Sequence, residues 1–468
     1  MGIVSIRRNL GRALRQVLHG VARWWGVLAL VGFGLALWAV GVRVYDHYFG
    51  PAHPSSDTPA VPVDRVEWVW SGGVTGDGAV VVARLDGEDA DVPAVTLDVR
   101  PVAATGNAHR RTVRSSPDAD RIVRWQIDGL EAGTAYRYAV VVGGDRDDGR
   151  GAGRFRTAPA GPRSMTVAVA ACARTGSNGA VFDAIRAVHP DLYVVEGDLH
   201  YGDVTGADPD TFLGLYDRVL TAPAQAALYR SVPVAYVWDD HDYGTNDADA
   251  SAPSRDAART AYRQAVPHYA LPAGSDTGAI YQAFTMGRVR FVLTDTRSER
   301  SGTSMLGRRQ LAWLLDELRT ASRTHALVVW VNPDPWIAPA DPGRDDWGGY
   351  AGERRRIADT IAETGTHNLV MLSGDAHMVA VDDGTNSDYS RAGGAGFPVL
   401  HAAALDRRGE VKGGPYSEGT FPGAGQFGTL SVHDHGGDRI TVDLAGRDWK
   451  GRTLVARSFD VPVPSTAE

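Results

Sequence analysis

Five apolar segments between residues 165 and 377 each end in a side chain that can bind a metal ion. The segments and their terminal residues are MTVAVAAC with Cys172, LYVVEGDLHY with Asp198, VPVAYVWDDHD with Asp240 and His241, ALVVWVN with Asn332, and NLVMLSGDAH with Asp375 and His377. Short runs rich in Val and Leu, separated by helix-like stretches, predict parallel strands of an α/β sheet. Because ligands bind just beyond the carboxyl ends of such strands, we expect these side chains to meet at one edge. The pattern indicates a metal-dependent hydrolase.

The same segments contain the residue types that a two-metal phosphate site requires. Two metal ions about 3.5–4 Å apart can clamp a phosphate and activate a water molecule for in-line attack. Such a site needs a bridging carboxylate, terminal ligands, and a histidine that protonates the leaving oxygen. The fragments GDLHYGD, WDDHDYGTND and SGDAH supply these groups through Asp198, Tyr201, Asp240, His241, Asn246, Asp375 and His377. Each fragment alone is common in loops, but three in order after strands indicate one site.

Cys172 is the only cysteine of the chain, so an intrachain disulfide is impossible. A buried, unreactive thiol is the ordinary role of a lone cysteine. Its position at the end of the first strand of the series favours a metal ligand instead.

The composition is that of a large, acidic globular protein. A length of 468 residues predicts two or more folded units. The net charge of −8 argues against non-specific binding to nucleic acid, which requires a basic surface.

The N-terminal segment predicts a membrane anchor. Residues 24–42 are uncharged and strongly apolar, and their length suffices for a helix that crosses a bilayer. Arginines are frequent in residues 1–23 and only Arg43 follows closely, so the positive-inside rule places residues 1–23 in the cytoplasm. A signal peptide is the alternative, but no small-x-small cleavage site follows the apolar run. We therefore expect a single-pass protein of the cell membrane with most of the chain extracytoplasmic, and a Pro/Ser-rich linker at residues 43–62.

Two folded regions are expected after the linker. Residues 63–159 contain short apolar or alternating runs between Gly and Asp turns, which predicts an antiparallel β sandwich. The fragment GLEAGTAYRYAVVV resembles the late strands of fibronectin type III domains. Residues 160–468 alternate strands with helices before an antiparallel tail, which predicts an α/β fold. Within them, residues 307–322 form the clearest amphipathic helix, with leucines along one face.

A set of motifs carries a family resemblance: Cys172 after the first strand, PDLYVVEGDLHY, VWDDHDYGTND, LTDTRSER, LGRRQLAWLLDEL, DDWGGYAGER and LSGDAH. In these motifs the chain resembles the PhoD-like alkaline phosphatase and phosphodiesterase family of the calcineurin-like metallophosphatase superfamily. The resemblance implies a layered β sandwich flanked by helices for residues 160–468, preceded by a fibronectin III-like β domain at residues 63–159. It also implies a metal-dependent phosphatase or phosphodiesterase.

The resemblance further implies a role for each residue of the site. Cys172 and Tyr201 would bind trivalent iron, and Asp198 would bridge the iron to a second metal. Asp240 would be a metal ligand, and His241 would be the transition-state histidine. The remaining ligands would be Asn332, Asp375 and His377. Oxygen donors suit Ca²⁺ better than Zn²⁺, so the expected pair is Fe(III) and Ca²⁺, with other divalent metals as alternatives.

Further residues are candidates for substrate binding, namely Arg174, Arg297, Arg354 and Asn246. Arginine binds phosphate oxygens through charge-assisted hydrogen bonds, although many arginines instead pair with carboxylates inside the protein. Asn246 and Asp239 have an alternative role in shaping the loop through Asx turns. His433 and His435 resemble a metal pair but follow no strand of the series, so a solvated turn is expected there.

Together these observations predict a membrane-anchored, extracytoplasmic metallophosphoesterase. A metal-activated hydroxide would attack phosphorus, the metals would neutralise the nonbridging oxygens, and His241 would protonate the leaving group. The substrate would be a phosphomonoester or a phosphodiester. The alternative is a catalytically inactive, metal-containing module that binds cell-envelope phosphates, although the presence of His241 argues against it. A nuclease is disfavoured by the negative charge and the lack of a basic stripe.

Overall fold

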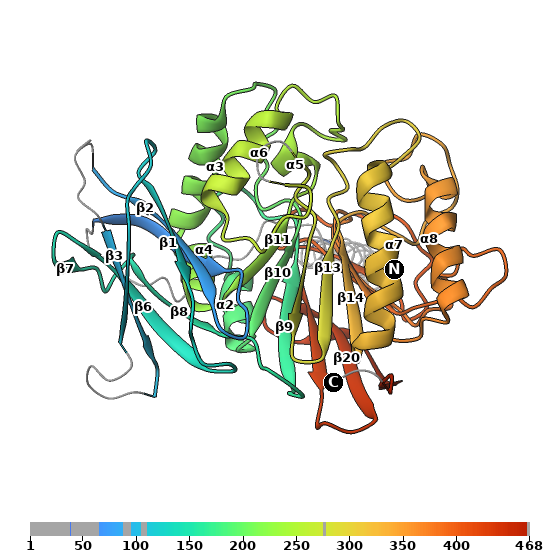
Figure 1. Ribbon diagram of the computed structural model, residues 1–468. Coiled ribbons are helices and arrows are strands. Elements are labelled where there is room, and N and C mark those ends of the chain that lie inside the picture. The colour runs from blue at the N-terminus through green and yellow to red at the C-terminus, as the bar shows by residue number, and fades with distance from the viewer. Residues whose placement is uncertain (1–37, 39–64, 88–94, 104–109, 275–277, 466–468) are drawn as a thin grey trace, which may run out of the picture. The chain divides into compact units, whose positions relative to one another are not determined.

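The computed structural model of the chain describes residues 38, 65–87, 95–103, 110–274 and 278–465. Its first large sheet has the strand order β21 (Thr453–Pro462), β20 (Arg439–Asp448), β19 (Gln426–His433), β9 (Met165–Ala170), β10 (Leu192–Glu196), β11 (Val234–Val237), β1 (Val66–Gly72), β2 (Ala79–Leu85) and β5 (Ile122–Ile127). Strands β9, β10 and β11 are parallel and lie side by side in Figure 1, and β19 runs antiparallel to β9. The predicted parallel strands before Cys172, Asp198 and Asp240 are therefore confirmed.

The second large sheet has the order β12 (Gln282–Met286), β13 (Val289–Leu293), β14 (Leu327–Asn332), β15 (Leu369–Ser373), β17 (Val399–Ala402), β16 (Met378–Asp382) and β18 (Thr420–Pro422). Strands β13, β14, β15 and β17 are parallel. This sheet packs against the first across a shared apolar core. A Cβ on Gly428 of β19 would lie 2.7 Å from the Cβ of Ala402. Only glycine permits such an approach, so the two sheets can lie close together at this position.

Helices cover the outer faces of both sheets. They are α2 (Ala180–Ala187), α3 (Pro209–Thr221), α4 (Pro223–Ser231), α5 (Asp240–Tyr243), α6 (Arg255–Ala265), α7 (Gly307–Thr324) and α8 (Ala351–Thr364). Figure 1 shows α7 and α8 beside β13 and β14. The apolar face of α7 is buried on the second sheet through Leu311, Leu314, Leu315 and Leu318. The predicted amphipathic helix is thus confirmed and extends two residues further.

The β-rich region that follows residue 65 shares its core with the α/β part. Strands β1, β2 and β5 continue the first sheet, whereas β3 (Val95–Pro101), β4 (Arg111–Ser115), β6 (Ala135–Val142), β7 (Asp145–Arg146) and β8 (Ala152–Arg156) form a third. Gly72 of β1 pairs in parallel with Val234 of β11, where an added Cβ would lie 2.4 Å from the Val234 carbonyl oxygen. The Trp70 indole N–H donates to the Ala265 carbonyl at 2.8 Å. An independent fibronectin III-like domain is therefore not supported, and the boundary between residues 159 and 160 stays a prediction.

The structure corrects the predicted membrane localisation. A helix that crosses a bilayer needs about 20 predominantly apolar residues. Among the described residues no helix is long and apolar enough, and α7, with 18 residues, carries charges throughout its exposed face. The proposed anchor at residues 24–42 lies outside the described residues except for Trp38. The segments 1–23 and 43–62 lie entirely outside them. The assignment as a single-pass membrane protein is therefore withdrawn.

Candidate metal centre

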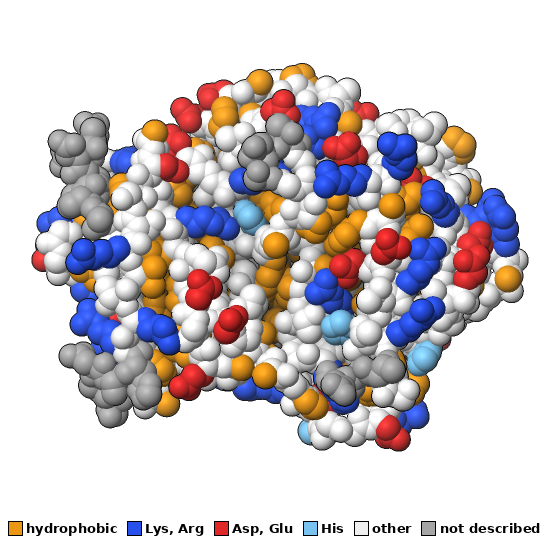
Figure 2. Space-filling model, in the orientation of Figure 1, with side chains coloured by type: hydrophobic (Ala, Val, Ile, Leu, Met, Phe, Trp, Pro, Cys, Tyr) orange, Lys and Arg blue, Asp and Glu red, His pale blue; other side chains and the backbone are white. Residues whose placement is uncertain are grey.

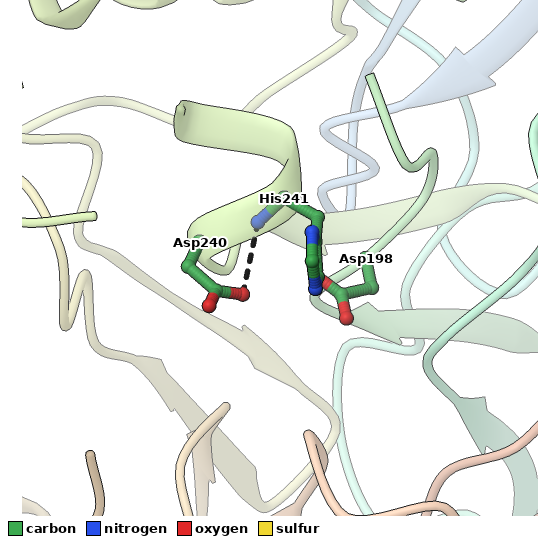
Figure 3. Close-up of side chains that lie close together, drawn as sticks. All are labelled: Asp198, Asp240 and His241. Carbon is green, nitrogen blue, oxygen red and sulfur yellow. Dashed lines mark hydrogen bonds between the residues drawn. The ribbon is translucent and has the colours of Figure 1, made fainter. Parts of the chain in front are cut away.

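Polar side chains converge beyond the carboxyl ends of β10 and β11. Asp198 follows β10, and Asp240 and His241 begin α5 shortly after β11. One ligand atom from each of these three residues lies within 4.8 Å of the other two (Figure 3). The backbone N–H of His241 donates to Asp240 Oδ1 at 2.9 Å, the contact drawn in Figure 3. A cation placed among them would have two carboxylates and one imidazole within reach.

Left-handed backbone turns direct further side chains toward the same edge. Cys172 has φ 63°, Asp198 has φ 51° and Asp375 has φ 66°, although none is glycine. Such residues seldom adopt positive φ, and they keep it where the surrounding structure enforces it. The three turns follow β9, β10 and β15 respectively. The ends of both large sheets therefore contribute to one site.

Cys172 and Tyr201 lie together on the buried side of this site. The Cys172 Sγ atom lies 3.5 Å from both Asp198 Oδ2 and the Asp375 carbonyl oxygen, either of which can accept its single S–H. The Tyr201 Oη atom lies 3.1 Å from His377 Nε2. Burial, followed by the Asp198 carboxylate, raises the pKa of the thiol and of the phenol well above their ordinary values. A bound cation would reverse this effect, because metal coordination deprotonates a thiol.

Buried carboxylate oxygens in the site lack protein partners. Among the described residues, Asp198 Oδ1 and Asp375 Oδ2 are buried and accept no hydrogen bond. Burial raises the pKa of Asp198 to about 7 and the pKa of Asp375 to about 8. A buried polar atom without a partner is costly, and a metal ion is one partner that removes the cost. The donor set therefore fits metal ions. We use the name metal centre for the candidate site formed by Cys172, Asp198, Tyr201, Asp240, His241, Asp375 and His377.

His241 has the environment of a proton donor. Its Nδ1 atom lies 2.5 Å from Asp203 Oδ1, so the imidazole donates its Nδ1–H to this carboxylate. Burial by itself would lower the pKa of His241, but Asp198, Asp240 and Asp203 raise it above the ordinary value. The ring also lies against Tyr201, with the ring centres 4.1 Å apart. Asp203 thereby holds the ring in place and leaves its other nitrogen for chemistry.

His377 has the opposite electrostatic environment. Burial, followed by the charges of Arg407 and Lys412, lowers the pKa of His377 to about 4. The imidazole is therefore neutral at physiological pH, which is the form that binds metals.

Some of the predicted residues lie at the margin of the metal centre. Asn332 uses both ends of its amide inside the protein, because Nδ2 donates to the Asp334 carbonyl and Oδ1 accepts from Trp347 Nε1. Asn246 and Arg174 have exposed side chains. The amide oxygen of Asn332 is therefore engaged in the structure instead of being free for a metal.

The structure places Arg297 and Arg354 in the interior, away from a substrate. Arg297 pairs with Asp239, with Asp334 at 3.0 Å and with Asp345 at 2.8 Å. Arg354 stacks on an aromatic ring and donates to two backbone carbonyls at 2.8 Å. Neither side chain is more than 1% exposed. Donors engaged in this way are not available to a phosphate, which corrects the expectation that these arginines bind substrate.

Sequence reasoning missed a second acidic group and a loop beside the metal centre. Asp240, Asp247 and Asp345 also bring one ligand atom each within 4.8 Å. Asp247 directly follows the predicted Asn246, and Asp345 lies in the DDWGG motif. The sequence around both residues therefore gave only a weak indication that they lie at the site. Residues 406–412, here called the site loop, connect β17 to β18. Their sequence, DRRGEVK, has no periodicity and matches no motif.

The chain is similar to known phosphatases in sequence and in fold. The profile of the family described as PhoD-like phosphatase matches residues 167–399. Alkaline phosphatase D of Bacillus subtilis (strain 168) is 25% identical over 374 residues, which are 66% of this chain and 64% of that protein. The chain therefore spans slightly less than two thirds of the length of this relative.

Two solved structures share the fold. One is described as the structure of PhoD, with a TM-score of 0.69 and 18% identity over 87% of this chain and 92% of that chain. The other is the purple acid phosphatase PPD1 from yellow lupin (Lupinus luteus) seeds, with a TM-score of 0.58 and 14% identity over 84% of this chain and 73% of that chain. Both likenesses support an α/β fold of the metallophosphatase type.

Proposed function

Because the chain belongs to the PhoD-like phosphatase family, we propose that it hydrolyses phosphate esters with the help of bound metal ions. The observation that carries the proposal is the convergence of Asp198, Asp240 and His241 within 4.8 Å, next to buried carboxylate oxygens without partners. Such a site can hold a cation and a phosphate together.

We further propose which residues hold the metals. Fe(III) would bind Cys172 and Tyr201, with Asp198 as the bridge to a second ion. Ca²⁺ would bind the oxygen donors Asp240 and Asp375, which are the ligand type that hard cations prefer. When bound, the metals supply Lewis acidity, an activated water molecule and neutralisation of the phosphate charge.

The residues of the chain contribute proton transfer and positioning. The carboxylates around His241 raise its pKa and so favour the protonated imidazole, and Asp203 orients the ring through Nδ1. His241 would therefore give a proton to the oxygen of the leaving alcohol. The buried Arg297 would fix Asp239 and Asp345, so the loops that precede and follow the site keep their positions.

The substrate would be a phosphomonoester or a phosphodiester of low or moderate size. A nucleic acid is disfavoured because the chain has a net charge of −8. On the face drawn in Figure 2, blue basic side chains of the described residues are interspersed with red acidic ones instead of forming a stripe. A nucleic-acid backbone needs a continuous basic surface.

The test uses the full chain purified without added metal. Its metal content would be measured together with the hydrolysis of p-nitrophenyl phosphate and bis-p-nitrophenyl phosphate, with Ca²⁺ added or withheld. We expect iron in the protein and turnover that rises with Ca²⁺, and the ratio of the two rates separates a monoesterase from a diesterase. Bound metal without turnover would support a binding module instead. A folded protein with neither metal nor turnover would refute the proposed site.

A further inference from the structure

Backbone hydrogen bonds connect the site loop and the residue before it to the metal centre at two points. The Leu405 backbone N–H, just before the loop, donates to the Ala171 carbonyl at 3.1 Å, next to Cys172. The Glu410 backbone N–H donates to the His377 carbonyl at 3.0 Å. Each contact joins the loop to a strand end that carries a proposed ligand. The backbone of the site loop is therefore held beside the metal centre.

Arg407 presents an unused guanidinium at this site. Its Cζ atom lies 3.7 Å from the centre of the Tyr201 ring. The Tyr201 ring in turn lies 4.1 Å from the His241 ring and places its Oη 3.1 Å from His377. Within the part of the chain that the structure describes, no N–H group of Arg407 donates a hydrogen bond. A guanidinium has five donors in a planar fork, and stacking on a ring orients this plane while leaving its edges open.

Three other cationic groups near the site, those of Arg297, Arg354 and Lys412, are engaged by groups of the protein. Arg297 and Arg354 are buried and paired, as described above. The Lys412 ammonium lies 2.8 Å from Asp375 Oδ1, so it orients this carboxylate and leaves Asp375 Oδ2 for a metal. Arg407 is half-buried at the site, and none of its N–H groups donates a hydrogen bond to the described residues.

We propose that Arg407 binds the nonbridging phosphate oxygens of the substrate, with Tyr201 as the platform that orients it. The inference rests on the proposed phosphoesterase function and assigns its substrate recognition to the site loop. Arginine suits this role because its parallel N–H groups match two oxygens of a phosphate. The cation would also offset the charge that the phosphate gains as the ester bond breaks.

The test compares Arg407→Ala and Arg407→Lys with the wild-type full chain. We expect kcat/KM of Arg407→Ala to fall about 10- to 100-fold, the range of a lost charge-assisted hydrogen bond, with part of the loss in KM. Arg407→Lys should recover only part of the activity, because a point charge does not replace a fork. Arg391→Ala is the matched control, since it removes the same charge from a side chain that is 78% exposed and pairs with Asp359.

A second measurement does not depend on turnover. Titration calorimetry with inorganic phosphate would be performed on the wild type, Arg407→Ala and Arg391→Ala, after metal content and melting temperature are shown to be equal. Weaker phosphate binding in Arg407→Ala alone supports the inference. Equal phosphate binding in all three proteins overturns it, even if the wild type hydrolyses esters. Loss of metal from Arg407→Ala also overturns it, because the residue would then support the metal centre. A wild type that neither binds phosphate nor turns over refutes this inference and the proposed function together.

Discussion

Replacing Arg297 should destabilise the protein strongly, because this guanidinium compensates several buried carboxylates. It pairs with Asp239, with Asp334 at 3.0 Å and with Asp345 at 2.8 Å, and its side chain is fully buried. The substitution Arg297→Met preserves the apolar length of the side chain and removes the charge. Breaking a buried ion pair by removing one partner costs about 3–5 kcal/mol, since the other charge is left uncompensated. We expect a loss of stability in this range.

This magnitude translates into a shift of the melting temperature. The entropy of unfolding is about 2.1 cal/mol/K per residue, so roughly 400 folded residues give about 0.8 kcal/mol/K. A loss of about 3–5 kcal/mol then lowers Tm by about 4–6 °C. The assay is thermal unfolding followed by calorimetry, with KM measured well below the transition.

Arg407→Ala is the comparison for Arg297→Met, because it should change activity instead of stability. It should lower kcat/KM while Tm changes by less than about 1 °C, because the Arg407 guanidinium donates no hydrogen bond to the described residues. If Arg297→Met instead kept the wild-type Tm and raised only KM, Arg297 would be a substrate-binding residue and the reasoning from its burial would be wrong.

Other predictions concern the metal centre and acid stability. Cys172→Ala should abolish iron binding, which elemental analysis of the purified protein checks; full retention of iron would exclude the thiol as a ligand. His241→Asn should lower kcat about 10²–10⁴-fold with unchanged metal content, and a wild-type rate would exclude His241 as the proton donor. Burial lowers the pKa of His401 from 6.5 to about 4, and its Nε2–H donates to the Ala376 carbonyl. The unfolded chain therefore binds this proton first, so stability is full above about pH 6.5 and falls by about 3 kcal/mol toward pH 4. His401→Gln should flatten the dependence of unfolding free energy on pH in this range, and an unchanged slope would contradict the assignment.

Much of the metal centre was accessible from the sequence because its signals are local. A run of Val and Leu indicates a buried strand, and the first polar residue after the strand must lie at the sheet edge. Asp198, Asp240 and His241 could be placed together on this basis, and the structure brings their ligand atoms within 4.8 Å. Helix α7 could also be predicted from a short segment, because four leucines at helical spacing define its buried face.

Other features had no local signal. The strands at residues 66–85 look like those of a separate sandwich, yet Gly72 lies so close to β11 that β1 joins the first sheet. Nothing in the pattern around Gly72 indicates which strand it will approach. The membrane assignment relied on one apolar run and its flanking arginines, and no helix within the described residues supports it.

The sequence by itself determined which residue types could hold metals and in which order their strands occur, because side-chain chemistry and hydrophobic periodicity are properties of short segments. Only the tertiary structure decided which arginine faces the site. Arg297 and Arg407 carry the same group, but one is enclosed by carboxylates from distant loops and the other is stacked on Tyr201 with open donors. The difference arises from contacts between segments far apart in the chain, and a guanidinium acts on substrate only when those contacts leave its N–H groups free.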